Sequence, residues 1–258
     1  MKNNKSLGQH WLKNRQILDE IASLAAGEGE NSGFCLEIGP GLGTLTSSLL
    51  RRFGAVMAIE YDSNLAYNLP KSFPGKNLKV IHQNFLDFDL SALPPRYIVA
   101  GNIPYYITSP IIEKLLSSPN LPARIVLLIQ KEVAERIVAE QGSHTLLSLS
   151  VQNRAFASLG PLVPRDEFTP PPKVDSQVII LDPRPEPIIP PEIFPFIKIG
   201  FSSPRKKLIS NLSAGLKLER AQLQEAFQAV GLSIDLRPAD LCHQDWFQLR
   251  QRLKNTHV

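Results

Sequence analysis

The chain has 258 residues, of which 43% are hydrophobic and 20% are charged. This composition excludes a disordered or fibrous protein and predicts one or two packed domains. The 28 Lys and Arg residues outnumber the 24 Asp and Glu residues and give a net charge of +4 at pH 7, which is too small to identify a partner by itself.

Short apolar segments alternate with segments of helical period over the first half of the chain. Strands are predicted over residues 34–38, 55–59, 78–81, 97–100 and 124–129. Helices are predicted ahead of the first strand near residues 17–25, and then over residues 44–52, 62–69, 109–117 and 131–140. This alternation is typical of a parallel sheet that is covered by helices on both faces.

The pattern changes after residue 142. Two longer strands are predicted over residues 146–157 and 174–181, and one reversed strand is expected at the end of the parallel sheet. Six prolines between residues 182 and 195 exclude a regular element there and indicate a domain boundary. Beyond it, helices are predicted over residues 204–214, 219–230 and 243–254. We therefore predict a mostly parallel, Rossmann-like α/β domain over residues 1–184 and a small all-helical domain over residues 185–258.

Cysteine usage and hydropathy predict the compartment. Cys35 and Cys242 lie more than 200 positions apart, so they support neither a disulfide framework nor a metal cluster, and the five His residues show no metal-ligand spacing. The first ten residues lack the apolar region of a signal peptide, and no apolar run approaches the roughly 18 residues of a membrane span. We therefore expect a soluble, cytoplasmic protein that uses neither a metal ion nor a membrane.

A glycine-rich turn, EIGPGLGT (residues 37–44), follows the first predicted strand. Glycines at such a junction let the backbone approach a ligand that lies over the strand ends. Glu60 ends the second strand, 21 residues after Gly39, where an acidic residue binds the hydroxyls of a ribose. Thr44 stands where a dinucleotide fingerprint has its third glycine, which disfavours a pyrophosphate and a nicotinamide cofactor. S-adenosylmethionine has a ribose and no phosphate and is the expected cofactor; the alternative is a tight turn without a ligand, and Glu60 argues against it.

The fourth predicted strand leads into NIPYY (residues 102–106). The amino group of a purine is a poor nucleophile, because its lone pair is delocalised into the ring. The side-chain carbonyl of Asn102 can accept a hydrogen of this amine and bring the lone pair toward a methyl donor. Tyr105 offers a ring on which a flipped or single-stranded base can stack. A packed loop is the alternative, and the position directly after a strand of the cofactor-binding sheet favours the functional interpretation.

Several separate blocks resemble the ribosomal RNA adenine N6,N6-dimethyltransferase family, the kasugamycin-sensitivity enzymes of the small subunit. The N-terminal block KSLGQHWL (residues 5–12), the glycine-rich turn and the NIPY motif are followed by QKEVAERI (130–137), FTPPPKVDS (168–176), RKKL (205–208) and RPADL (237–241). The resemblance covers nearly the whole chain, and so many blocks in the family's order are not expected by chance. It implies a class I methyltransferase fold with a helical C-terminal domain that binds RNA.

The resemblance also implies roles for individual residues. The expected catalytic residues are Asn102 at the target amine, Tyr105 stacked on the target adenine, and Phe168 on the opposite side of that base. The expected cofactor-binding residues are His10, Leu12, Gly39, Gly41, Glu60, Asn84 and Asn102.

Two positions depart from the family pattern. Asn84 stands where the family usually has an aspartate that accepts a hydrogen bond from the adenine of the cofactor. The amide carbonyl still accepts this bond, but without charge assistance, which makes it weaker by roughly 1 kcal/mol. After Gly142 and Ser143, where the family commonly has a lysine, this chain has His144. No RNA contact is therefore assigned to that loop.

The basic residues are segregated along the chain. Residues 1–18 and 193–218 hold nine basic residues and no acidic one, whereas the other 19 basic and 24 acidic residues sum to −5. Such segments favour binding to a polyanion, although a solvated surface is the common alternative. The residues expected to contact RNA phosphates are Lys5, Lys13, Arg205, Lys206 and Lys207.

Together, these features predict an enzyme that uses S-adenosylmethionine to dimethylate the N6 amino groups of two adjacent adenosines. The resemblance implies a hairpin near the 3′ end of 16S rRNA as the target, and the expected partner is small-subunit rRNA in a pre-ribosomal particle, bound by a monomer. Two alternatives stay open. One is a large-subunit rRNA adenine methyltransferase, and the other is a ribosome-assembly factor that binds RNA without turnover.

Overall fold

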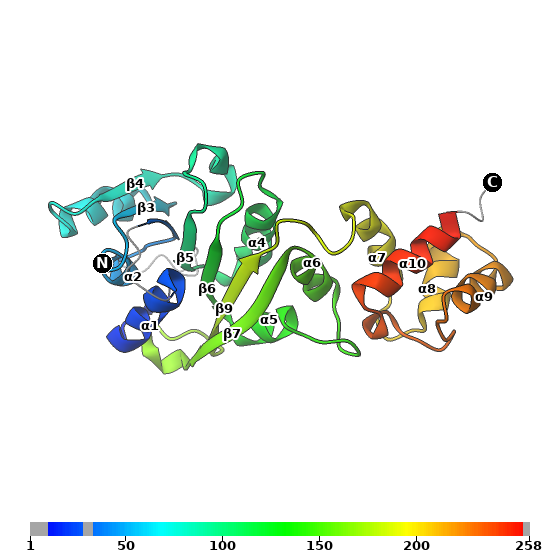
Figure 1. Cartoon of the computed structure of the whole chain (residues 1–258). Coiled ribbons are helices and arrows are strands. Elements are labelled where there is room, and N and C mark those ends of the chain that lie inside the picture. Colours follow the sequence, from blue (N-terminus) through cyan, green and yellow to red (C-terminus); the bar gives the residue numbers. More distant parts are fainter. Residues whose placement is uncertain (1–9, 28–32, 255–258) are drawn as a thin grey trace. The chain divides into compact units, whose positions relative to one another are not determined.

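The computed structural model describes residues 10–27 and 33–254. The chain folds into two compact units, one made of residues up to 135 and 156–183, and the other made of the remaining residues (Figure 1). Each unit has its own apolar core. No helix in the described ranges is both long and apolar enough to cross a membrane. The same residues hold no group of three or more potential metal ligands.

The larger unit is built on a seven-stranded sheet in the order β4-β3-β2-β5-β6-β9-β7. The five strands from β4 to β6 are parallel to their neighbours, and β9 runs antiparallel to β6. The strands are β2 (Phe34–Ile38), β3 (Ala55–Glu60), β4 (Leu78–His82), β5 (Ile98–Asn102), β6 (Arg124–Gln130), β7 (Ala155–Val163) and β9 (Ser176–Pro183). This confirms the predicted mostly parallel sheet with a reversed strand. Because β2 lies between β3 and β5, the carboxyl ends of these three strands meet at one edge of the sheet.

Helices and short turns connect these strands. The helices are α1 (Arg15–Ala26), α2 (Thr44–Leu49), α3 (Ser63–Asn68), α4 (Thr108–Ser117) and α5 (Lys131–Ile137). The short 3-10 turns are η2 (Leu69–Ser72), η3 (Phe85–Asp87), η4 (Leu90–Ala92), η5 (Tyr105–Ile107) and η6 (Arg165–Glu167). A separate two-stranded sheet pairs β1 (Trp11–Leu12) with β8 (Phe168–Thr169).

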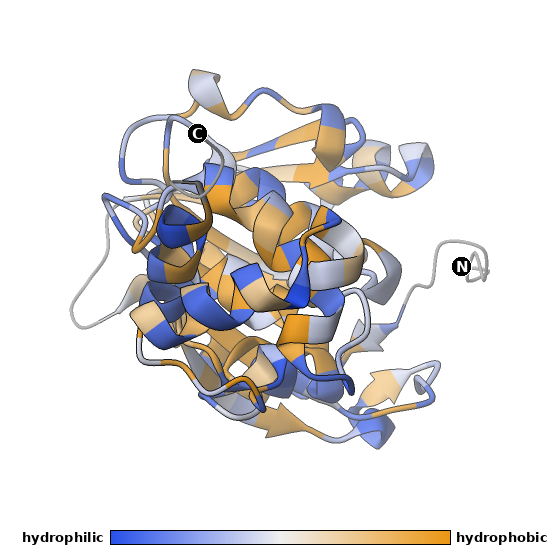
Figure 2. Ribbon diagram, turned by 90° about the vertical axis from the view of Figure 1, so that its right-hand side faces the viewer, coloured by the Kyte–Doolittle hydropathy of each residue, from blue (hydrophilic) through white to orange (hydrophobic). Residues whose placement is uncertain are grey.

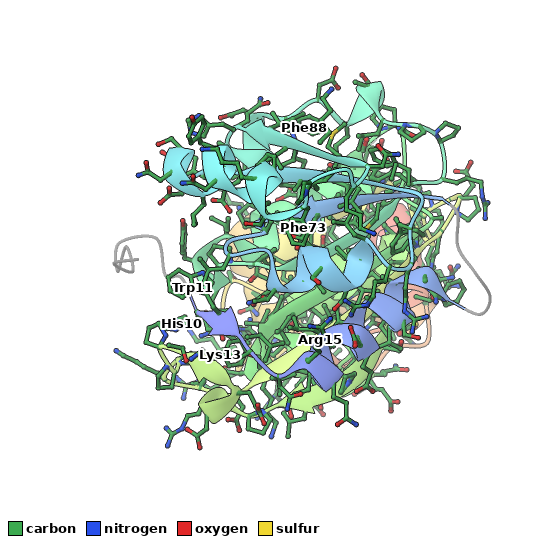
Figure 3. The ribbon with its side chains drawn as sticks, turned by 90° about the vertical axis from the view of Figure 1, so that its left-hand side faces the viewer. His10, Trp11, Lys13, Arg15, Phe73 and Phe88 are labelled. Atoms are coloured by element: carbon green, nitrogen blue, oxygen red, sulfur yellow. The ribbon has the colours of Figure 1, made fainter. Side chains whose placement is uncertain are left out.

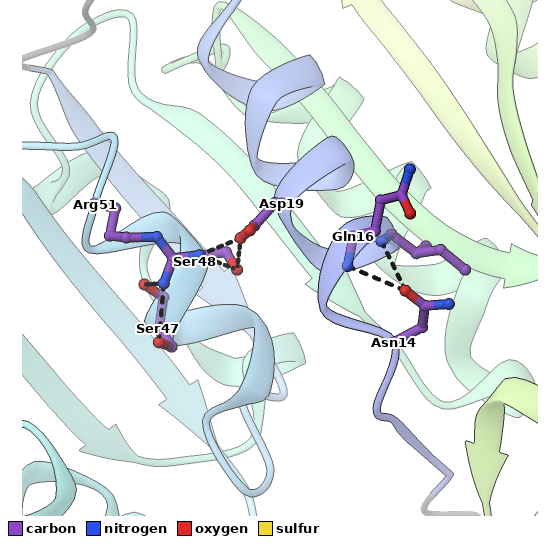
Figure 4. A network of polar contacts seen from close by, with 7 residues as sticks. Asn14, Gln16, Asp19, Ser47, Ser48 and Arg51 are labelled. Atoms are coloured by element: carbon purple, nitrogen blue, oxygen red, sulfur yellow. Dashed lines mark hydrogen bonds and ion pairs between the residues drawn. The ribbon is translucent and has the colours of Figure 1, made fainter.

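The N-terminal helix is fixed at its start and along its side. Asn14 caps α1, and its side-chain oxygen accepts hydrogen bonds from backbone N–H groups of the first turn. Farther along α1, Asp19 accepts a hydrogen bond from Ser48 Oγ of α2 at 2.6 Å and forms an ion pair with Arg51 (Figure 4). These contacts hold α1 beside the helix that follows the glycine-rich turn.

The predicted strand over residues 146–157 is wrong over most of its length. Residues Leu146–Arg154 form the helix α6, and β7 begins only at Ala155. Thr145 starts this helix: its Oγ1 accepts a hydrogen bond from the Ser148 N–H at 3.1 Å, and Ser148 Oγ accepts one from the Thr145 N–H at 2.8 Å. This capping box satisfies the donors at the helix start, so local capping outweighs the alternating apolar pattern that is typical of a strand.

In the part of the chain that the structure describes, the smaller unit is helical. With α6 it contains α7 (Phe194–Gly200), α8 (Leu208–Leu216), α9 (Arg220–Ala229), α10 (His243–Lys254) and the turns η7 (Pro191–Ile193) and η8 (Pro238–Asp240). Its core surrounds Trp246, whose ring contacts Phe196 and Phe201. Hydrophobic and hydrophilic residues alternate along these helices in Figure 2, as expected for helices with one buried face.

The sequence pattern misses α7 because this helix begins inside the proline-rich stretch. Pro195 occupies its first turn, where a backbone N–H has no partner within the helix, so proline is tolerated there. The predicted division into a methyltransferase domain over residues 1–184 and an RNA-binding domain over residues 185–258 stays a prediction. The compact units differ from it in one respect, because residues 136–155 belong with the helical unit.

Candidate active site

The carboxyl ends of β2, β3, β4 and β5 surround a cavity of about 420 Å³. This volume lies in the range of small-molecule and cofactor sites. The structure brings together at this cavity most of the residues predicted from the sequence, which are His10, Gly39, Gly41, Glu60, Asn84, Asn102 and Tyr105. The cavity is therefore the candidate active site.

The glycine-rich turn forms one wall of the cavity. Gly39 and Gly41 have φ values of +66° and +57°, which side chains other than glycine rarely adopt. A Cβ atom on Gly41 would lie 3.1 Å from the indole nitrogen of Trp11, so the turn also leaves room for this ring. Backbone atoms of the turn are thereby free to approach a ligand.

Glu60 ties the end of β3 to the glycine-rich turn. Its Oε2 accepts a hydrogen bond from the Gly41 N–H at 3.0 Å, and its Oε1 accepts one from the Asp62 N–H at 2.8 Å. The side chain is buried, and this burial raises the pKa of the carboxyl above its usual value, while the backbone N–H donors oppose the shift. Each oxygen keeps a second acceptor site, which is the chemistry that the hydroxyls of a ribose require.

Glu37 is a functional candidate to which sequence analysis assigned no role. It belongs to β2, lines the cavity and is only 1% exposed. Thr46 Oγ1 donates a hydrogen bond to its Oε2 at 2.6 Å, but its Oε1 has no hydrogen-bond partner among the described residues. Burial raises the pKa of this carboxyl to about 8. An unpartnered buried carboxyl oxygen at a cavity wall is suited to a hydrogen bond with a polar group of a ligand.

Asn102 lies at the end of β5 and is oriented by the N-terminal segment. Its Nδ2 donates a hydrogen bond to the backbone oxygen of His10 at 3.0 Å, so Oδ1 is the atom left to accept a hydrogen from a substrate amine. The His10 ring is fixed in turn by a 2.7 Å hydrogen bond between Nδ1 and the backbone oxygen of Pro170. In Figure 3, His10 and Trp11 belong to the segment that runs along the molecule into α1.

Tyr105 follows Asn102 by three residues and is held from two sides. Its hydroxyl makes a 2.7 Å hydrogen bond with Ser176 Oγ at the start of β9. Its ring is stacked on the His10 ring with a centroid separation of 6.0 Å and an interplanar angle of 18°. The ring orientation is therefore set before any substrate arrives.

Two predicted residues do not line the cavity. Leu12 and Phe168 are paired across β1 and β8, and both side chains are buried in the apolar core of the larger unit. Their roles at the cofactor and at the target base stay predictions, because neither ring nor side chain reaches the cavity wall in this structure. A local sequence pattern could not predict this burial, because it depends on the pairing of two residues that lie 156 positions apart.

Asn84 lies at the cavity wall after β4, but part of its hydrogen-bonding capacity is used. Its Oδ1 accepts a hydrogen bond from the Leu86 N–H at 3.1 Å and caps the turn η3. One acceptor site on the oxygen and both N–H donors remain for a ligand.

The predicted phosphate contacts occur in different environments. Lys13 is exposed beside the segment that contains His10 and Trp11 (Figure 3), and Lys5 lies outside the described residues. In the smaller unit, Arg205, Lys206 and Lys207 are exposed, and Lys207 forms an ion pair with Asp235. These three residues lie in the turn before α8, which begins at Leu208, and not within the helix that was predicted from residue 204.

Comparison with known protein families matches residues 1–254 to the family described as ribosomal RNA adenine dimethylase. A ribosomal RNA small subunit methyltransferase A from Acaryochloris marina is 38% identical over 270 residues, which cover 98% of each chain. A protein of the same name from Nostoc sp. is 40% identical, over 96% of this chain and 97% of the relative.

Two solved structures are also similar to this chain over nearly its full length. A dimethyladenosine transferase from Plasmodium falciparum is 28% identical with a TM-score of 0.78, over 96% of this chain and 98% of that one. The 23S rRNA methyltransferase ErmE is 26% identical with a TM-score of 0.73, over 95% of this chain and 99% of that one. Both similarities extend over the two compact units and confirm the predicted class I methyltransferase fold.

Proposed function

The chain belongs to the ribosomal RNA adenine dimethylase family, and from this premise we propose that it dimethylates the N6 amino groups of two adjacent adenosines in a hairpin near the 3′ end of 16S rRNA. The methyl donor is S-adenosylmethionine. The observation that carries the proposal is the orientation of Asn102 by His10, which presents an amide oxygen at the end of β5. The names of the relatives at 34–40% identity favour small-subunit RNA as the substrate.

The residues of the cavity fit this cofactor, which supplies a methyl group on a positively charged sulfur. Glu60 is suited to the ribose hydroxyls, and Asn84 to the adenine. The positive φ angles of the glycine-rich turn allow the backbone to approach the methionine part. The unpartnered Oε1 of Glu37 adds a buried polar atom to this wall of the cavity.

The chemistry assigned to Asn102 is electrostatic. Its Oδ1 accepts one hydrogen of the target amine and orients the nitrogen lone pair into the cavity. During transfer the amine gains positive charge, and a carbonyl oxygen that is already in place stabilises this charge without reorganisation. The proton leaves to water afterwards. In the second transfer, the same oxygen accepts the single hydrogen that remains on the monomethylated amine.

The hydrogen bond between Tyr105 and Ser176 predicts a positioning role for Ser176. We expect Ser176→Ala to raise the KM for RNA about three- to tenfold, because the stacking ring loses its anchor, which is worth about 1 kcal/mol. The dissociation constant of the cofactor should change less than twofold. Steady-state kinetics and calorimetry with the cofactor alone measure these values. An equal rise in the KM for RNA and in the dissociation constant of the cofactor would mean that the substitution disturbs the whole sheet and does not act through the Tyr105 ring alone.

The same fold in ErmE keeps large-subunit RNA as a candidate substrate. Incubation of the protein with unmethylated small or large ribosomal subunits, followed by mass spectrometry of the RNA nucleosides, separates the two. We expect N6,N6-dimethyladenosine in the small subunit only. A product confined to the large subunit would contradict the proposed substrate, and association with small subunits without methyl transfer would indicate an assembly factor.

We also propose that the pre-ribosomal particle is contacted by Lys13 and by the cluster of Arg205, Lys206 and Lys207. Phosphate contacts release counterions, so affinity for the RNA should fall steeply between 50 and 200 mM salt. Replacing Arg205 and Lys206 with glutamine should make the negative slope of log affinity against log salt less steep by about 2. The affinity for the cofactor should change neither with salt nor with these substitutions. Filter binding across a salt series measures this slope. An unchanged slope would show that the two side chains are only solvated.

A further inference from the structure

The turn η5 at the cavity carries two tyrosines in different states. Tyr105 is half-buried and hydrogen-bonded to Ser176, whereas the next residue, Tyr106, also lines the cavity and is 65% exposed. Among the residues that the structure describes, none makes a hydrogen bond, an ion pair or a ring contact with the Tyr106 side chain. A large exposed ring at the mouth of a cavity is suited to binding a planar group from outside.

The position of Tyr106 in the sheet identifies which part of the cavity it serves. The strand order places β2 between β3 and β5. Glu60 ends β3 and Tyr61 follows it, on the side that fits the ribose and adenine of the cofactor. Asn102 ends β5 on the other side, and Tyr106 follows that strand. Tyr106 therefore lies at the substrate end of the cavity and away from the cofactor's adenine.

From this geometry we propose that Tyr106 stacks on the adenosine next to the one that enters the cavity. The inference rests on the proposed function, in which two adjacent adenosines are methylated. Tyr105 and Tyr106 are consecutive residues of one turn, so two consecutive bases of a single strand can be bound by consecutive rings. In one of the two transfers, the unreacted adenosine of the pair is the neighbour that supplies a purine face for Tyr106. The pair of adenosines is thereby recognised as a pair, although only one amine reacts at a time.

A thermodynamic cycle tests this contact. The ligands are a synthetic RNA hairpin with two adjacent adenosines in its loop and two derivatives in which one of these adenosines is replaced by an abasic nucleotide. The proteins are the wild type, Tyr106→Ala and Tyr106→Phe, with Tyr67→Ala as the matched control. Tyr67 is 71% exposed on α3 and does not line the cavity. Dissociation constants for each RNA and for the cofactor are measured, and methyl transfer to small subunits is followed in parallel.

We expect Tyr106→Ala to weaken binding of the intact hairpin about 5- to 100-fold, which is the usual effect of removing one stacked ring. Tyr106→Phe and Tyr67→Ala should stay within threefold of the wild type, and cofactor affinity should not change. With the abasic hairpin that lacks this neighbouring adenosine, Tyr106→Ala should cause almost no further loss, because the stacking partner is already absent. Equal losses on intact and abasic hairpins would overturn the contact while leaving the proposed function in place. Absence of methyl transfer by the wild type would overturn the proposed function and this inference together.

Discussion

Replacing Asn102 with alanine is expected to lower the rate of methyl transfer about 100- to 1,000-fold. The substitution removes the oxygen that accepts the amine hydrogen, and loss of one preorganised polar group at a developing charge usually has an effect of this size. Because Nδ2 also holds the backbone oxygen of His10, a stability loss of about 1 kcal/mol should accompany it. Single-turnover kinetics with saturating cofactor and RNA measure the chemical step directly.

Two further measurements make this result specific. Affinity for the cofactor should fall less than tenfold in Asn102→Ala, since the residues proposed for the ribose and the adenine, Glu60 and Asn84, lie at the end of β3 and just after β4. Ser176→Ala serves as the matched control, because it changes a neighbouring contact of the same cavity and retains the amide oxygen. A transfer rate for Asn102→Ala within fivefold of the wild type would contradict the role given to the amide.

The Glu37→Gln variant is expected to be more stable than the wild type, by an amount that increases with pH. In the unfolded chain the carboxyl ionises near pH 4.5, whereas in the folded protein burial raises its pKa to about 8. Between these values the folded state binds more protons than the unfolded state, so the stability of the wild type falls as pH rises and levels off above pH 8. Glutamine keeps the acceptor for Thr46 and has no charge to bury. We expect a difference of roughly 1 to 3 kcal/mol at pH 8 and a small one at pH 4.5.

Urea unfolding at a series of pH values from 4.5 to 9 measures this difference. Glu113→Gln is the control, because Glu113 is exposed on α4 and its replacement should change stability by less than about 0.5 kcal/mol at each pH. A constant difference between Glu37→Gln and the wild type over this range would mean that Glu37 is already ionised in the folded protein. In that case, a hydrogen-bond donor must reach Oε1 to stabilise the buried charge.

Local pattern was sufficient to predict the parallel sheet and the residues that follow its strands. Glu60 and Asn102 lie at the ends of apolar strand segments, so their place at one edge of the sheet follows from topology alone. The orientation of Asn102 depends on His10, which is 92 residues away, and no local pattern contains this contact. Likewise, the burial of Phe168 results from the pairing of β1 with β8, two strands of two residues each.

The wrong strand and the overlooked Glu37 also depend on contacts that a local sequence pattern does not contain. The residues before Ala155 form a helix and not the predicted strand, because the capping box at Thr145 starts a helix there. The spacing of apolar residues does not show such a capping box. Glu37 was not predicted as a candidate residue, because a single acidic residue inside an apolar strand has no pattern of its own. Its significance depends on a cavity wall and on one unsatisfied oxygen, and both appear only in three dimensions.

The contacts that anchor His10 and Tyr105 join residues that are far apart in the chain, which has a consequence for the order in which the site can form during synthesis. The glycine-rich turn and the strands around it are complete once β5 has emerged. His10, however, is fixed by Pro170, 160 residues later, and Tyr105 by Ser176, 71 residues later. A nascent chain that ends before these residues therefore has the cofactor half of the cavity without an anchored base-stacking ring. We therefore expect a chain that is truncated before Pro170 to be inactive toward RNA, because it lacks the anchors of His10 and Tyr105 and also strand β9 of the sheet.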